Sequence, residues 1–94
     1  MRRGKPDANH QEITRFFESH GCSVLDIKSI INSCDIFVAK NGRTVAVEIK
    51  DGNKPPSQRR LTEGEIIFRD TWLGEWRLVE GTDDALAVID FLNL

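Results

Sequence analysis

Two runs rich in apolar residues flank the dipeptide Asn41-Gly42 in residues 34–51, CDIFVAKNGRTVAVEIKD. Asn-Gly between two such runs is a strong signal for a β-hairpin, because both residues tolerate the positive φ angles of a type I′ turn. If these two residues form the turn, Lys40 faces Arg43, and each further pair lies one residue further from the turn on both strands. The pattern therefore predicts a hairpin whose register is set by its turn.

The two faces of this predicted hairpin differ in character. One face is apolar and carries the pairs Val38–Val45, Ile36–Val47 and Cys34–Ile49. The other face places Asp35 opposite Glu48, with Lys50 two residues further along. Like charges directly opposed across two strands destabilise a sheet. A divalent cation held between the two carboxylates relieves this repulsion, so the pattern predicts a Mg²⁺ or Mn²⁺ site.

Helical periodicity and capping residues predict a first helix before the hairpin. It is expected to begin near Asn9, whose side chain caps the first turn, with Glu12 in capping-box position and Gly21 closing its end. Glu12 lies at the end of the apolar stripe, where its carboxylate can also turn toward the sheet and supply a third oxygen ligand. Residues 22–27 are expected to form a short strand.

The second half of the chain is expected to hold two helices and one strand. Residues 51–60, with two consecutive prolines, are predicted to be a loop without regular structure. Thr62 and Glu65 form a capping box for a helix that runs to about Leu73. Residues 76–80 are expected to be a strand, and Thr82 to cap a last helix. The order helix, three strands, helix, strand, helix predicts an α/β fold with helices packed on a small sheet.

Composition is that of an ordinary soluble domain. The chain has 94 residues, 39% hydrophobic and 30% charged, which suits one domain over residues 1–94. No apolar run reaches the length of a membrane span, and the first residues lack the apolar segment of a signal peptide, so a cytoplasmic location without membrane contact is expected. Cys22 and Cys34 are expected to be reduced and buried.

Charge is unevenly distributed along the chain. Residues 1–60 hold eleven Lys and Arg against seven Asp and Glu, whereas residues 61–94 hold two against eight, for a net charge of −2. Such asymmetry favours a polyanion-binding half. Two basic clusters are the predicted phosphate contacts: Arg2, Arg3 and Lys5 in an N-terminal arm (1–8), and Lys54, Arg59 and Arg60 after Lys50.

The residues at this point resemble a known family. Asp35, twelve intervening residues and then Glu48-x-Lys50 is similar to the motif of the PD-(D/E)XK nuclease superfamily. More narrowly, RRGKPDANHQEI and CDIFVAKNGRTVAVEIKDGNKPPSQRRLT resemble small phage and prophage nucleases of the VRR-NUC type, over nearly the whole chain. The resemblance implies a restriction-endonuclease-like core with a three-stranded antiparallel meander.

The same resemblance implies an activity and a set of site residues. It implies a Mg²⁺- or Mn²⁺-dependent endonuclease, encoded by phage or prophage and acting as a homodimer on branched DNA such as Holliday junctions. By this resemblance, the metal ligands of the site are expected to be Asp35, Glu48, the backbone carbonyl of Ile49 and Glu12, with Lys50 as the catalytic cation.

Two positions depart from the family pattern. Cys34 stands where the superfamily name has proline, a change that many members share. Glu65 stands where related sequences often carry glutamine, so only a capping role is expected for it. His10 and His20 are expected at the surface and at the core boundary.

Two other functional classes stay open on the sequence. One is a non-catalytic module that binds nucleic acid or assists phage DNA processing on the same fold. The other is a protein-interaction module whose acidic C-terminal half docks a basic partner. Neither needs the carboxylate pair beside Lys50.

Overall fold

The computed structural model of the protein describes residues 8–94, so Arg2, Arg3 and Lys5 of the predicted basic arm lie outside the described residues. Regular structure covers most of this range. In chain order the elements are α1 (His10–Ser19), β1 (Ser23–Asp26), β2 (Ile36–Lys40), β3 (Arg43–Ile49), a 3₁₀ turn (Pro56–Gln58), α2 (Glu63–Thr71), β4 (Glu75–Val79) and α3 (Thr82–Leu92).

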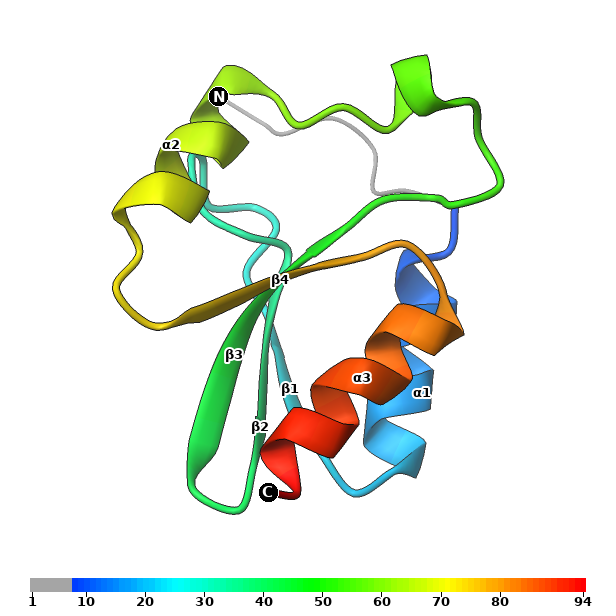
Figure 1. Cartoon of the computed structure of the whole chain (residues 1–94), viewed down its shortest axis with the longest axis vertical. Helices are drawn as coiled ribbons and strands as arrows, with labels where there is room; N and C mark the ends of the chain where they lie inside the picture. Colours follow the sequence, from blue (N-terminus) through cyan, green and yellow to red (C-terminus); the bar gives the residue numbers. More distant parts are fainter. Residues whose placement is uncertain (1–7) are drawn as a thin grey trace.

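The four strands form one mixed sheet in the order β1-β2-β3-β4. The first three strands are antiparallel neighbours, and β4 pairs with β3 in parallel. Figure 1 shows α1 and α3 side by side against the sheet, with α2 away from them at the other end of the view. Residues 8–94 therefore form a small mixed α/β protein with three α-helices, as predicted, whereas its restriction-endonuclease-like character stays a prediction.

The turn of the hairpin has the predicted conformation. Asn41 and Gly42 have φ angles of 56° and 78°, and Lys40 pairs with Arg43. The register then runs through Val38–Val45 to Ile36–Val47 without a slip. Because the side-chain period of a strand is two, this register fixes which residues face each helix layer.

Beyond Ile36–Val47 the backbone departs from the simple ladder. The amide of Asp35 donates to the carbonyl of Val47 at 3.1 Å, and the side chain of Asp35 accepts from the amide of Ile49 at 2.8 Å. Cys34 packs on the α2 side of the sheet, while Ile49 is buried on the opposite side. The predicted apolar pair Cys34–Ile49 is therefore wrong, because a carboxylate takes the place of a ladder partner here.

Two apolar clusters lie on opposite faces of the sheet. The larger one fills the space under α1 and α3; its side chains include Ile13, Phe17, Ile36, Val38, Val45, Val47, Ile49, Val79, Val88 and Leu92. The smaller one lies toward α2 and joins Ile27, Cys34 and Ala46 to the partly buried Phe37, Phe68 and Trp76. The α1–α3 layer thus supplies most of the core.

Several local predictions for helix ends are wrong. Asn9 makes no side-chain cap to α1, and its amide nitrogen instead donates to the carbonyl of Lys50 at 3.0 Å. Gly81, not Thr82, is the N-cap of α3. The segment after Lys50 contains one turn of 3₁₀ helix that begins at Pro56, since proline is well suited to the first helical positions.

Neither histidine lies in its expected environment. His10 is buried, with Nε2 3.4 Å from Oδ2 of Asp26, so its predicted surface position is wrong. His20 is exposed, with Nδ1 2.8 Å from the carbonyl of Phe16. Among the described residues, none of the helices has both the length and the apolar character needed to cross a membrane.

Candidate functional site

A cluster of buried carboxylates lies where β2 begins and β3 ends, on the face toward α2. Asp35 and Glu48 are both buried, and Glu48 is only 2% exposed. Their side chains are hydrogen-bonded to each other. Although the strand ladder ends one pair earlier, the predicted meeting of these two carboxyl groups is confirmed.

Helix α2 brings a third carboxylate into this cluster. Oε1 of Glu65 is 3.0 Å from the ammonium Nζ of Lys50, and both side chains are about nine-tenths buried. The Glu65 side chain is also hydrogen-bonded to Glu48. Asp35, Glu48, Glu65 and Lys50 thus form one connected polar group, which we call the carboxylate–lysine cluster.

Glu65 belongs to this cluster as well as to the cap of its own helix. The capping box is formed as predicted, with the Thr62 amide donating to Oε1 of Glu65 at 2.8 Å and the Glu65 amide donating to Oγ1 of Thr62 at 3.2 Å. One oxygen of Glu65 therefore accepts from both Thr62 and Lys50. The expectation of a capping role alone is too narrow, because a local capping signal does not reveal a contact made across the fold.

The cluster relieves its own repulsion with a proton. Burial raises the pKa of Glu48 from its ordinary 4.5 to about 10, and the hydrogen bond to Asp35 and the negative charges of Asp35 and Glu65 act in the same direction. At neutral pH Glu48 is therefore protonated and can donate a hydrogen bond to a neighbouring carboxylate. In the absence of a cation, this proton lowers the repulsion between the carboxyl groups, and a cation between Asp35 and Glu48 stays a prediction.

The pKa of Glu65 is shifted in the opposite direction from that of Glu48. Burial by itself raises its pKa, but the hydrogen bond from the Thr62 backbone and those to Lys50 and Glu48 outweigh burial, so the pKa of Glu65 is lowered. Glu65 is thus the ionised partner of the Lys50 ammonium. Neighbouring carboxyl groups whose pKa values are pushed apart are typical of functional sites.

The other predicted metal ligands are not gathered here. Glu12 is exposed on α1, and none of the contacts described for residues 8–94 joins it to the carboxylate–lysine cluster. Ile49 contributes its amide to Asp35, and a ligand role for its carbonyl stays a prediction. Across residues 8–94, no three or more His, Cys, Asp and Glu side chains are arranged as a ready-made metal site.

Of the basic residues that follow Lys50 in sequence, Arg59 makes contacts away from the carboxylate–lysine cluster. Arg59 donates from Nε to the carbonyl of Lys54 at 2.7 Å and from its guanidinium to Glu80 at 2.9 Å. Arg60 is exposed. Phosphate binding by Lys54, Arg59 and Arg60 stays a prediction. To bind a phosphate, the guanidinium of Arg59 would have to release Glu80.

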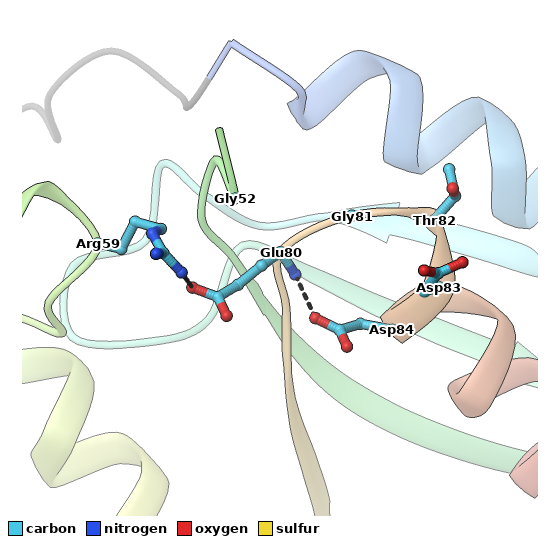
Figure 2. A pocket seen from close by; sticks show the side chains of 7 residues that line it. All are labelled: Gly52, Arg59, Glu80, Gly81, Thr82, Asp83 and Asp84. Carbon is cyan, nitrogen blue, oxygen red and sulfur yellow. Dashed lines mark hydrogen bonds and ion pairs between the residues drawn. The ribbon is translucent and has the colours of Figure 1, made fainter. Parts of the chain in front are cut away.

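A hollow of about 320 Å³ opens where the loop after β3 meets the start of α3. Figure 2 shows the Arg59 guanidinium turned toward the Glu80 carboxylate, and the Asp84 carboxylate turned toward the Glu80 amide, 2.9 Å away. The lining residues are Gly52, Arg59, Glu80, Gly81, Thr82, Asp83 and Asp84. Three carboxylates against one guanidinium make this hollow unsuited to an anion, and it is separate from the carboxylate–lysine cluster.

Comparisons with known proteins add no identity to this arrangement. No protein-family model, curated protein or solved structure matches the chain. The carboxylate–lysine cluster is therefore the structural feature that bears on function.

Proposed function

We propose that the protein is a Mg²⁺- or Mn²⁺-dependent endonuclease of the PD-(D/E)XK superfamily, similar to the VRR-NUC type. The observation that carries this proposal is the buried group of Asp35, Glu48 and Lys50 where β2 begins and β3 ends, completed by Glu65 from α2. A structural role alone does not account for it, because burying several carboxyl groups together is costly and apolar side chains fill such a space more favourably.

The carboxyl groups suit a hard divalent cation. Mg²⁺ is usually held by one or two carboxylates, with waters and substrate phosphates completing its coordination, so Asp35 and Glu48 are sufficient protein ligands. Glu48 is held protonated by burial and by its carboxylate neighbours, and a cation in place of that proton satisfies the same oxygens. When bound, the metal polarises a phosphoryl oxygen and lowers the pKa of a water molecule.

The remaining residues act on the phosphate and the water. The Lys50 ammonium is held by Glu65 at the edge of the cluster, where its fixed positive charge can orient the attacking water and stabilise charge that develops on the phosphate. Glu65 is the positioning residue for Lys50, and its place in the α2 cap fixes its side chain. Lys54, Arg59 and Arg60 are the proposed contacts to the nucleic-acid backbone.

The proposed substrate is branched DNA such as a Holliday junction, in the cytoplasm of a bacterial host. Each chain carries one carboxylate–lysine cluster, so a cut in two strands requires two copies, and a two-fold symmetric pair is the simplest arrangement for a two-fold symmetric junction.

A cleavage assay tests the proposal directly. Four-way junction, flap, single-stranded and linear duplex DNA are incubated with the protein in Mg²⁺, in Mn²⁺ and in EDTA. We expect metal-dependent cleavage, strongest on the junction, that is lost in Asp35→Asn and kept in Glu18→Gln, an exposed carboxylate on α1. Binding of DNA without cleavage in either metal would favour the non-catalytic module and refute the nuclease.

Metal binding should also raise thermal stability. A ligand that binds only the folded state stabilises it by about 2.7 kcal/mol at a hundredfold excess over its Kd, which for a domain of this size corresponds to a rise of roughly 10–20 °C in Tm. We expect Mn²⁺ to shift the Tm of the parent protein upward and to leave that of Asp35→Asn nearly unchanged. Asp90→Asn, which removes an exposed carboxylate on α3, serves as the control that keeps the shift. Equal shifts in all three proteins would place the bound metal elsewhere.

A further inference from the structure

Three aromatic side chains stack on one another on the face of the sheet toward α2. Trp72, the first residue after α2, stacks on Phe68 of the same helix and on Phe37 of β2, with ring centroids 5.3 and 5.6 Å apart. Phe37 and Phe68 are half-buried against the smaller apolar cluster, whereas Trp72 is 38% exposed. We call these three side chains the aromatic stack, and Trp72 is its most exposed member.

The exposed ring of Trp72 is held in one orientation. Its indole N–H donates to the carbonyl of Glu75 at 3.2 Å. The ring also lies against Gly74, where a Cβ atom would come within 2.8 Å of the indole nitrogen. A ring fixed by these contacts and by two phenyl rings loses little freedom when a ligand binds to it, so its exposed surface is a preorganised contact.

The aromatic stack borders the carboxylate–lysine cluster on both the sheet and the helix. Phe37 pairs with Ala46, and Glu48 follows Ala46 by two residues on β3, roughly 7 Å further along the same face. On α2, Phe68 follows Glu65 by three residues, a spacing at which helical side chains are neighbours. Since a DNA strand advances about 3.4 Å per nucleotide, a base within a few nucleotides of a phosphate at the cluster reaches the aromatic stack.

The chemistry of this surface suits an unpaired nucleobase. Every base has a flat π face, and proteins commonly hold single-stranded nucleic acid by stacking bases on aromatic side chains. The charges that precede Trp72, on Arg69 and Asp70, are paired with each other at 2.8 Å, and Leu73 after it is apolar and fully exposed. The surface therefore offers a ring to a base and not a charge to a phosphate.

The position of the stack favours a base over a protein partner. A strand bound at the carboxylate–lysine cluster has to continue across the neighbouring surface, and the aromatic stack is part of that surface. A base inside a duplex is covered on both faces by its neighbours. Only a base outside the paired stack can therefore reach the ring of Trp72.

We propose that the aromatic stack binds one unpaired base of the DNA strand held at the carboxylate–lysine cluster, with Trp72 as the stacking residue. The identity of the strand as DNA rests on the proposed function, whereas stacking on Trp72 needs neither a metal nor cleavage. A fully paired duplex lacks the base that this site binds. The site thus selects flaps and opened branch points over linear duplex DNA.

Binding of flap DNA in EDTA tests the site without cleavage. A fluorescein-labelled duplex with a short single-stranded flap is prepared as a series in which one nucleotide at a time, on either side of the branch point, is abasic and so keeps its phosphate without its base. In fluorescence anisotropy, the parent protein is expected to lose affinity about 5–100-fold at one position of the series, as for the loss of one stacked base. Equal affinity along the whole series would overturn the proposal.

Two substitutions of Trp72 separate stacking from packing. Trp72→Phe keeps a flat ring and is expected to keep the loss at the same abasic position. Trp72→Leu keeps an apolar side chain over Phe37 and Phe68 but has no π face, so it is expected to bind intact flap DNA as weakly as the parent binds the abasic DNA, with no dependence on position. Leu86→Ala, which changes a residue 45% exposed on α3, is the control that keeps the parent pattern.

Circular dichroism of each variant verifies folding. A Trp72→Leu protein with the parent pattern would overturn the proposal. An equal loss of affinity in Trp72→Phe and Trp72→Leu would do the same, because it would assign Trp72 a packing role only.

Tryptophan fluorescence reports on the contact itself. The chain has two tryptophans, so in the Trp76→Phe variant all tryptophan emission comes from Trp72. Intact flap DNA is expected to quench this emission. Flap DNA that is abasic at the sensitive position is expected to leave the emission nearly unchanged at equal saturation of the protein. Equal quenching by the two DNAs would place the base away from Trp72 and refute the site.

The outcomes for this site and for the nuclease are distinct. Position-dependent binding by a protein that cleaves no DNA would refute the nuclease and leave the stacking site intact. Conversely, cleavage of flap DNA by Trp72→Leu at the parent rate, with the protein well below its Kd so that the rate reports affinity, would refute the stacking site and leave the nuclease intact.

Discussion

Cleavage by the Lys50→Met variant is expected to be reduced by about 10²–10³-fold, the usual effect of removing one fixed group that stabilises a transition state. Methionine keeps most of the length of the side chain and removes its charge. The matched control is Lys28→Met, which removes a lysine that is paired with Asp26 at the surface. Rates are measured on four-way junction DNA under single-turnover conditions, and a Lys50→Met rate within about threefold of the parent would refute the catalytic role of Lys50.

A second variant separates this chemical loss from a structural one. Lys50→Met leaves Glu65 buried without its cation, which is expected to destabilise the fold by about 1–3 kcal/mol. Glutamine at position 65 keeps the capping box, since Gln serves there as well as Glu. The double variant Lys50→Met/Glu65→Gln should therefore regain the lost stability and remain inactive. Recovery of cleavage together with stability would mean that Lys50 serves only the fold.

The metal-free protein is expected to lose stability as the pH rises from 6 to 8, and the Glu48→Gln variant to lose much less. Burial raises the pKa of Glu48 to about 10 in the folded state, against an ordinary value of 4.5. Between these two values the folded chain holds a proton that the unfolded chain releases, so the free energy of unfolding falls with pH by up to about 1.4 kcal/mol per unit. The lowered pKa of Glu65 acts in the opposite sense, but only below its own ordinary value.

Denaturant unfolding in EDTA at several pH values measures this slope. Across pH 6–8 the parent protein should lose up to about 2.7 kcal/mol that Glu48→Gln retains, since an amide has no proton to release. Glu18→Gln should keep the slope of the parent, because Glu18 is exposed. Parallel curves for the parent and Glu48→Gln would show that Glu48 is already ionised at pH 6. Excess Mn²⁺ should flatten the parent curve, because the cation takes the place of the proton.

Local chemistry explains which parts of the fold could be predicted. The turn at Asn41-Gly42 fixes the register as far as Ile36–Val47, and the Thr62–Glu65 capping box depends on residues three apart. Both signals are contained within a few residues. The meeting of Asp35 with Glu48 followed from the same register, which is why the core of the candidate site was accessible from the sequence.

Contacts between distant segments explain what could not be predicted. Asparagine is a favoured N-cap residue, yet the side-chain amide of Asn9 donates a hydrogen bond to the backbone carbonyl of Lys50, 41 residues away. The sequence around Glu65 indicates a helix cap. Its second contact, with Lys50, arises only when α2 packs over the sheet. His10 lies in the first turn of α1, where its sequence position suggests exposure. It is buried because β1, with Asp26, packs beside it in the fold.

The parallel pairing of β3 with β4 has a consequence for how such a chain can diversify. Parallel neighbours cannot be joined by a tight turn, so the chain makes a long crossover from Lys50 to Glu75 that carries the basic segment and α2. Insertions in the part of this crossover without regular structure cost little, about 0.6 kcal/mol for each doubling of the length of a flexible loop. The surface beside the carboxylate–lysine cluster can therefore vary through the loop before α2, while β2, β3 and the helix that holds Glu65 stay unaltered.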